Sequence, residues 1–205
     1  MKTSLMIAAG LVSGLAASAQ AGIVLQSNPA QSTSALGAYL ADLSYVSQTA
    51  TTGKLTIAIT NTTPTALGGF LTALVFNTPG SVSGVTLASG PTNFSLISNV
   101  SASPYGTYAY GASTSSSFEG GGNPNRGLAV GASGTLVFNI TASNAATLTA
   151  SSFLIGGDDA FVVRFRGFAN GGSDKVPGTI VPSPGSAALL GLAGLSCARR
   201  RRGQK

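Results

Sequence analysis

Short segments rich in β-branched and aromatic residues recur through the middle of the chain, separated by Gly, Pro, Asn and Ser. Such segments predict β-strands, and the separators predict turns. The candidate strands are LTIAITN from Leu55, FLTALVFN from Phe70, SVSGVTLA from Ser81, NFSLISNV from Asn93, YGTYAYGA from Tyr105, GTLVFNITA from Gly134 and AFVVRFRGF from Ala160. One weak helical candidate, residues 144–153, lies between the last two, and FEGGGNPNRG, residues 118–127, is expected to be a loop.

Several of these segments alternate between apolar and polar residues, which places one face of each strand against a core. The apolar residues of this pattern are Leu55, Ile57 and Ile59 in one segment and Leu136, Phe138 and Ile140 in another. Many short alternating strands with turns between them predict an all-β fold. We expect an antiparallel β-sandwich of the jelly-roll or immunoglobulin/cohesin-like type, with a closed barrel as the alternative.

The formal net charge of +6 would suggest an acidic partner, but the charges are unevenly distributed along the chain. Lys2 lies at the front, and Arg199, Arg200, Arg201, Arg202 and Lys205 lie at the back. Between residues 22 and 181 the charged residues are Lys54, Arg126, Arg164, Arg166 and Lys175 against Asp42, Glu119, Asp158, Asp159 and Asp174. This body is formally neutral, which argues against a polybasic face, and we expect no nucleic-acid partner.

The N-terminus, MKTSLMIAAGLVSGLAASAQAG, begins with an early lysine and continues with an apolar stretch over residues 5–17. Small residues at Ala19 and Ala21 then match the requirement for signal-peptide cleavage after Ala21. The alternative is a buried N-terminal helix, which Gly10 and Gly14 would weaken. The pattern therefore predicts a signal helix over residues 1–21 and export through the secretion machinery.

Catalytic residues are scarce in this sequence. The chain has no histidine, and its one cysteine, Cys197, lies in the C-terminal apolar run. Histidine-dependent triads and histidine-ligated metal sites are therefore excluded, and the body must hold together without an internal disulfide. Paired carboxylates could serve a glycosidase, but Asp158 and Asp159 are adjacent in a Gly-rich loop, where they would seldom face one cleft. We predict a non-enzymatic protein that needs no cofactor.

Two candidate binding sites remain. Asp158 and Asp159, in the sequence GGDD, supply oxygen ligands of the kind that calcium prefers, although a solvated turn before the next strand explains the same residues. Tyr108 and Tyr110 would share one face of a strand and could stack against a sugar ring. The alternative for these tyrosines is packing into the fold.

The C-terminal tail begins with Pro182, Ser183 and Pro184 and continues with an apolar run over residues 185–198. As a helix, that run is about 21 Å long at about 1.5 Å per residue, against a hydrocarbon core of about 30 Å. The arginine cluster at Arg199, Arg200, Arg201 and Arg202 would stop transfer and stay on the cytoplasmic side. The run is therefore too short for a comfortable permanent anchor, and the tail predicts a short C-terminal transmembrane helix that holds the chain transiently with the body outside the cell. A plain membrane anchor is the alternative.

A Pro-x-Pro motif, a short apolar run and a terminal arginine cluster follow one another in this tail. This order resembles the PEP-CTERM sorting signal of exported bacterial surface proteins. The resemblance covers residues 181–202, with Pro182 and Pro184 matching the two prolines and Ser183 standing where the family usually has Glu. It implies recognition by an exosortase, a processing enzyme of the membrane that would cleave the tail. The passage FVVRFRGFANGGSDKVPG, residues 161–178, is also similar to the junction that precedes such tails.

The sequence therefore predicts three parts: a signal peptide at 1–21, a β-sandwich domain at 22–176 and a PEP-CTERM-like sorting tail at 177–205. We expect an exported protein that the tail holds transiently in the inner membrane before it reaches the cell surface or the extracellular space. There it would be a structural or adhesive component, in contact with extracellular polysaccharide. The alternative is a carbohydrate- or calcium-binding module anchored at its C-terminus.

Overall fold

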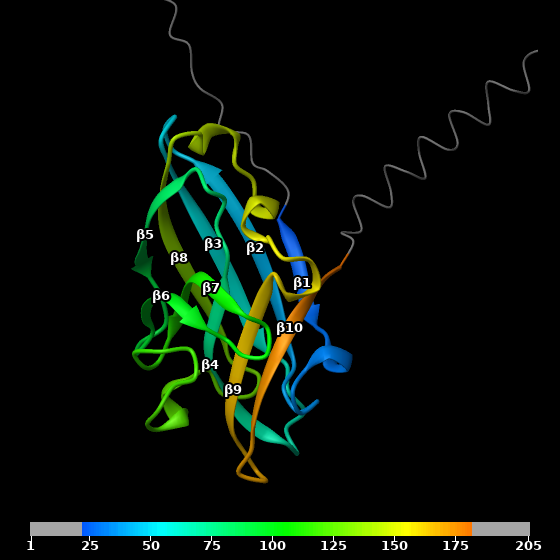
Figure 1. Cartoon of the computed structure of the whole chain (residues 1–205). Coiled ribbons are helices and arrows are strands. Elements are labelled where there is room, and N and C mark those ends of the chain that lie inside the picture. Colours follow the sequence, from blue (N-terminus) through cyan, green and yellow to red (C-terminus); the bar gives the residue numbers. More distant parts are fainter. Residues whose placement is uncertain (1–21, 182–205) are drawn as a thin grey trace, which may run out of the picture.

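The computed structural model describes residues 22–181 of the chain (Figure 1). Within this range there is no α-helix, and the only helical segments are short 3-10 turns. The strands are β1 (Ile23–Ser27), β2 (Tyr39–Ser47), β3 (Thr52–Asn61), β4 (Gly68–Phe76), β5 (Val82–Ser89), β6 (Ser95–Ser101), β7 (Thr107–Ser113), β8 (Ser133–Ala142), β9 (Phe161–Phe168) and β10 (Ser173–Val181). The 3-10 turns are η1 (Pro29–Gln31), η2 (Pro124–Arg126), η3 (Ala145–Thr147), η4 (Ala150–Phe153) and η5 (Gly157–Asp159).

The strands form one ten-stranded sheet in the order β5-β8-β3-β2-β1-β10-β9-β4-β7-β6. All of the pairings are antiparallel. The sheet curls so that its edge strands β5 and β6 come close together, which makes the fold nearly closed and barrel-like (Figure 1). The prediction of an all-β antiparallel fold is confirmed.

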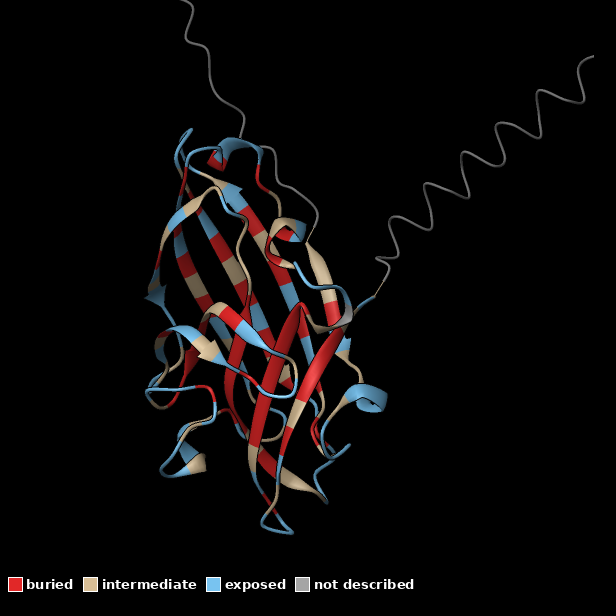
Figure 2. Cartoon of the chain, viewed as in Figure 1, coloured by how far each residue is buried: buried red, intermediate tan, exposed pale blue. Residues whose placement is uncertain are grey.

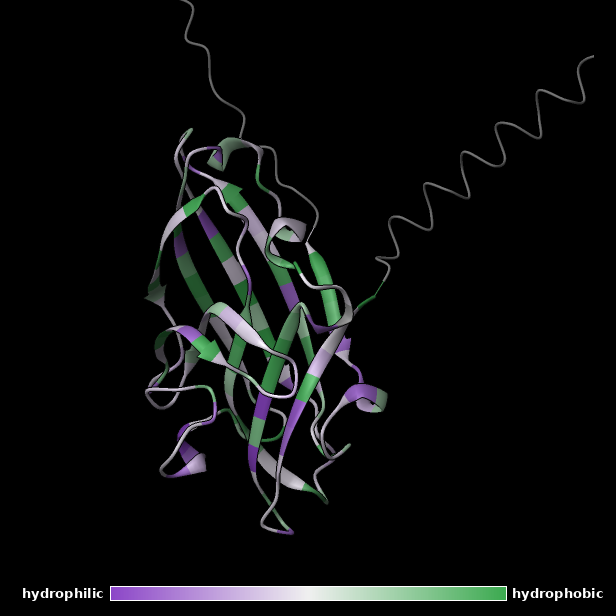
Figure 3. Cartoon of the chain, in the orientation of Figure 1, coloured by the Kyte–Doolittle hydropathy of each residue, from purple (hydrophilic) through white to green (hydrophobic). Residues whose placement is uncertain are grey.

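The alternation expected from the sequence is present in β3 and β8. Leu55, Ile57 and Ile59 are buried, while on the opposite face Lys54 and Ala58 are exposed and Thr56 is half-buried. In β8, the expected apolar residues are buried in the same way. The resulting bands of burial and hydropathy are visible along the strands in Figures 2 and 3.

The main core fills the interior of the curled sheet and is rich in aromatic side chains. The ring of Phe76 meets the ring of Phe138 edge-on at a centroid distance of 5.1 Å. Phe153 from η4 reaches Tyr45, with ring centroids 5.4 Å apart, and so covers one end of the interior. A second, smaller cluster lies on the opposite side of β4 and β9, where Phe118 packs with Val75 and Val162.

Some details differ from the sequence-based expectations. The helical candidate at residues 144–153 forms the two separate turns η3 and η4, because Leu148 and Thr149 between them adopt extended backbone angles. The last strand, β10, continues to Val181, past the domain boundary expected at residue 176. The expected terminal helices lie outside the described residues. Within the described range, no helix has the length and apolar character needed to cross a membrane.

Candidate functional site

The first and last strands of the fold lie side by side. β1 pairs with β10 in antiparallel register, with Val24 opposite Val181 and Leu25 opposite Ile180. Since β1 begins at Ile23 and β10 ends at Val181, the chain enters and leaves the fold at the same place (Figure 1). We call this place the terminal edge, defined by Ile23 and Val24 of β1 and by Ile180 and Val181 of β10.

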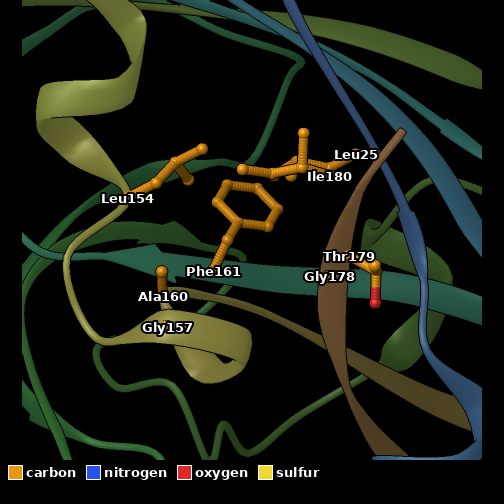
Figure 4. Close-up of a pocket in the computed structure, with 8 residues that line it drawn as sticks. All are labelled: Leu25, Leu154, Gly157, Ala160, Phe161, Gly178, Thr179 and Ile180. Carbon is orange, nitrogen blue, oxygen red and sulfur yellow. The ribbon is translucent and has the colours of Figure 1, made fainter. Parts of the chain in front are cut away.

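A pocket of about 300 Å³ adjoins the terminal edge (Figure 4). It exists because β10 runs further than its neighbour β9, whose pairing with β10 ends at Val162 opposite Pro177. Residues 178–181 therefore have β1 on one side, while the η5 turn takes the place of β9 on the other. We call this pocket the terminal notch; its lining residues are Leu25, Leu154, Gly157, Ala160, Phe161, Gly178, Thr179 and Ile180.

The lining of the terminal notch is mainly apolar. None of the described residues that line it carries a charge. Ile180 is 54% exposed, and Ile155, which follows the lining residue Leu154, is 44% exposed. Large apolar side chains are usually withdrawn from water, and these two are half exposed, as are Leu40 and Val46 of β2, which do not line this pocket.

Gly178, in the lining of the terminal notch, lies against a buried tyrosine. An ideal Cβ at this position would lie 2.5 Å from the hydroxyl oxygen of Tyr39. That hydroxyl is buried and has no hydrogen-bond partner within the described part of the chain. Burial also raises the pKa of Tyr39 well above its ordinary value. Glycine at 178 thus lets the strand pass directly over a buried tyrosine.

The other end of β10 is held by a buried carboxylate. Asp174 is fully buried and accepts hydrogen bonds from the hydroxyl of Thr33 at 3.0 Å and from the backbone N–H groups of Ser34, Leu36 and Gly37 at 2.9, 2.7 and 2.9 Å. These donors satisfy both carboxylate oxygens. Asp174 therefore fixes the loop before β2 against the start of β10.

A cluster of charged side chains lies on the outer face of β9 and β10. Glu119 contacts Arg164 at 2.7 Å and Lys175 at 2.5 Å. Arg164 is largely buried, and this burial lowers its pKa, while the nearby Glu119 carboxylate acts in the opposite direction. The cluster holds the loop after β7 over the sheet, beside the buried Phe118.

Tyr105 joins the same outer face to the N-terminal part of the fold. Its hydroxyl lies 2.5 Å from the carbonyl oxygen of Gln31 and 3.1 Å from that of Lys175. Burial, together with the negative charges of Asp174 and Asp159, raises the pKa of Tyr105 to about 12. Tyr105 is thus a structural residue, which no pattern in the sequence indicated.

The two tyrosines considered for sugar stacking do not form an exposed pair. Tyr108 is only 2% exposed, and its hydroxyl donates to the backbone carbonyl of Asp159. Burial and the charge of Asp159 raise its pKa. Tyr110 is partly buried against the main core. The expectation of an aromatic platform is wrong for Tyr108, because a stacking ring must be open to solvent.

Asp158 and Asp159 lie in η5, at the rim of the terminal notch. Gly156 and Gly157 before them adopt positive φ angles of 124° and 70°, which glycine tolerates readily. Asp159 is partly buried, and the side chain of Asp158 lies outside the described part of the structure. Among the residues that the structure describes, no three His, Cys, Asp or Glu side chains gather in a group that could hold a metal ion.

The residues that the sequence analysis expects to carry processing signals lie outside the described residues. These are Ala19 and Ala21 at the expected cleavage site, Pro182, Ser183 and Pro184 in the sorting motif, and Arg199, Arg200, Arg201 and Arg202 in the stop-transfer cluster. The terminal edge is the part of the described structure that adjoins both sets. No family model, curated protein or solved structure matches this chain.

Proposed function

We propose that this protein is an exported, surface-sorted and non-enzymatic component of the cell envelope or extracellular matrix, with a structural or adhesive role. The two ends of its sequence supply the reason. A signal-peptide pattern precedes residue 22, and a tail that resembles the PEP-CTERM signal follows Val181. An exosortase-type enzyme would process that tail, with Pro182, Ser183 and Pro184 as the motif that it reads.

The observation that carries this proposal is the pairing of Val24 with Val181. An export signal before β1 and a sorting tail after β10 would leave the domain at one edge. Both apolar segments could then enter the same membrane while the domain stays folded outside it. The arginines at the end of the tail would remain on the cytoplasmic side of the membrane. The N-terminus of the signal peptide would lie on the same side.

The surface of the domain supports a role outside the cell. On the outer face of β3 and β8, hydroxyl side chains predominate, among them Thr56, Thr60, Ser133, Thr135 and Thr141. Such a face can exchange hydrogen bonds with a hydrated polysaccharide without strong electrostatic attraction or repulsion. We further propose that the curled sheet is a two-layer sandwich of the jelly-roll or cohesin-like type, in which β1 and β10 join the layers.

A second candidate function is carbohydrate binding, and one feature favours it. A groove of about 340 Å³ crosses the outer face of β2, β3 and β8, and its lining includes Asp42, Thr60, Ser133 and Thr135. A carboxylate among hydroxyl groups is suited to sugar hydroxyls. Asp42→Asn and Thr135→Val would each weaken binding on a glycan array if this groove is a sugar site, and unchanged binding would exclude it.

The main proposal is tested by comparing variants of the tail in the native host. In Pro182→Ala/Pro184→Ala we expect the tail to stay attached and the protein to remain in the membrane fraction. Ser183→Glu restores the residue that the family usually has, so we expect processing at least as complete as in the unaltered protein. Pro29→Ala, at an exposed proline in η1, is the control for the loss of a proline as such. Equal processing of all four proteins would contradict the proposed recognition.

A further inference from the structure

We propose that the terminal notch, with its rim residues Ile155 and Ile180, is the surface through which the folded domain contacts the phospholipid bilayer. This inference rests on the proposed function, because it requires the tail to enter the membrane. It adds an orientation: the terminal edge faces the lipid, and the outer faces of the sheet do not.

The length of the connection carries the first step. β10 ends at Val181, and the apolar run begins at Gly185, so only Pro182, Ser183 and Pro184 separate them. Even fully extended, these residues reach about 10 Å, at about 3.3–3.6 Å per residue. A tail inserted from Gly185 onward therefore holds the terminal edge close to the point where the chain enters the bilayer.

The apolar surface at this end carries the second step. Among the described residues, the large hydrophobic side chains with the greatest exposure are Leu40, Val46, Ile155 and Ile180. Ile180 lines the terminal notch, and Ile155 follows Leu154 of its lining. Apolar groups of peripheral proteins enter the boundary between headgroups and acyl chains by about 5–10 Å. Ile155 and Ile180 could enter the bilayer to this depth.

The distribution of charge carries the third step. The residues that line the terminal notch are uncharged, and the charged residues at its rim are Asp158 and Asp159 of η5. The ion pairs of Glu119 with Arg164 and Lys175 lie on the outer face of β9 and β10. A contact made by Ile155 and Ile180 would depend on apolar burial rather than on attraction to anionic headgroups. With two acidic residues at the rim, it should form on zwitterionic lipid and gain nothing from anionic lipid.

The experiment uses the absence of tryptophan from the chain, since any introduced tryptophan is then the only one. The full chain is reconstituted into phosphatidylcholine vesicles that contain brominated lipid, with the single cysteine, Cys197, labelled to report insertion of the tail. Ile155→Trp and Ile180→Trp probe the rim. Leu40→Trp is the matched control, since Leu40 is 47% exposed but belongs to β2 and does not line the terminal notch.

We expect the lipid to quench the emission of Ile155→Trp and Ile180→Trp about twofold and that of Leu40→Trp hardly at all, because only the first two positions would enter the interface. Adding phosphatidylglycerol should not strengthen the quenching at either rim position. If the label at Cys197 is quenched but neither rim tryptophan is, the inference is overturned while the proposed membrane step stands. Equal quenching of all three tryptophans, or quenching that needs phosphatidylglycerol, also overturns it. An unquenched Cys197 label contradicts the membrane step and the inference together.

Discussion

The two ends of strand β10 differ in how they are packed. At its start, Asp174 is fully buried and accepts four hydrogen bonds from the loop before β2. At its end, Ile180 is 54% exposed beside an apolar pocket, with β1 as its strand neighbour on one side only. One strand thus joins a closed end of the molecule to an open one.

This difference shows where the fold requires a particular side chain to satisfy its backbone hydrogen bonds. A loop that closes an end of the sheet carries backbone N–H groups that must find acceptors, and Asp174 supplies them. The terminal edge faces the parts of the chain that continue beyond the domain, so no loop closes it. The closed end should therefore be sensitive to substitution, and the open end should be tolerant except where it covers the core.

The largest effect is expected at the closed end. Asp174→Ala removes the acceptor of the buried N–H of Gly37 and of the partly buried N–H groups of Ser34 and Leu36, so we expect the free energy of unfolding to fall by about 3–5 kcal/mol. Urea denaturation measures this loss, and Asp42→Asn, at an exposed carboxylate of β2, is the control with a change near zero. A loss below about 1 kcal/mol at Asp174 would show that the closed end does not depend on this carboxylate.

At the open end, Gly178→Ala should have an intermediate effect. The added Cβ would meet the hydroxyl of Tyr39, which is buried against the aromatic core, so we expect a loss of about 1–3 kcal/mol. Gly178→Ala combined with Tyr39→Phe removes the clashing oxygen and should recover part of that loss. Thermal unfolding of both variants makes the comparison. If the double variant recovers nothing, the clash with the Tyr39 hydroxyl is not the cause of the loss.

The alkaline limit of stability should depend on Tyr105. The pKa of Tyr105 is raised to about 12 in the fold, from an ordinary value of 10.0, so the neutral phenol is favoured in the native state. Its contribution is then fully present below about pH 10 and is lost as the pH rises through about 12. Tyr105→Phe should cost about 1 kcal/mol at neutral pH and reduce the fall in stability between these values. An unchanged alkaline profile would assign that fall to other groups.

The smallest effect is expected for Ile180→Ser. Its side chain is more than half exposed, so we expect a change of at most about 0.5 kcal/mol in the free energy of unfolding. The same measurement as for Asp174→Ala gives the value. A loss of more than about 1.5 kcal/mol would mean that Ile180 belongs to the core and that the end of β10 is not open.

Part of this fold could be read from the sequence. The alternation in β3 and β8 identified their buried faces, because a strand with one buried side has a period of two. The same signal was present in β2, where Tyr39, Ala41, Leu43 and Tyr45 are all buried, but we did not include this segment among the expected strands. Strand β10 was harder, since Pro177 interrupts it and its buried residues include a carboxylate.

The candidate site was less predictable, for physical reasons. The donors to Asp174 lie about 140 positions earlier in the chain, so no local pattern connects them. The terminal notch depends on β10 extending beyond β9, and this follows from strand register rather than from composition. Alternation places Tyr108 and Tyr110 on one strand face and so suggests a ligand site, but alternation does not predict which face of a curled sheet a loop will cover.

The measurement that tests the central claim most directly is the intact mass of the protein isolated from its native host. If the protein is exported and sorted through its tail, the mature form begins at Gly22 and ends before the apolar run at residues 185–198. A protein that retains Met1, or one that keeps Arg199 to Arg202 and stays in the membrane fraction, would contradict that claim.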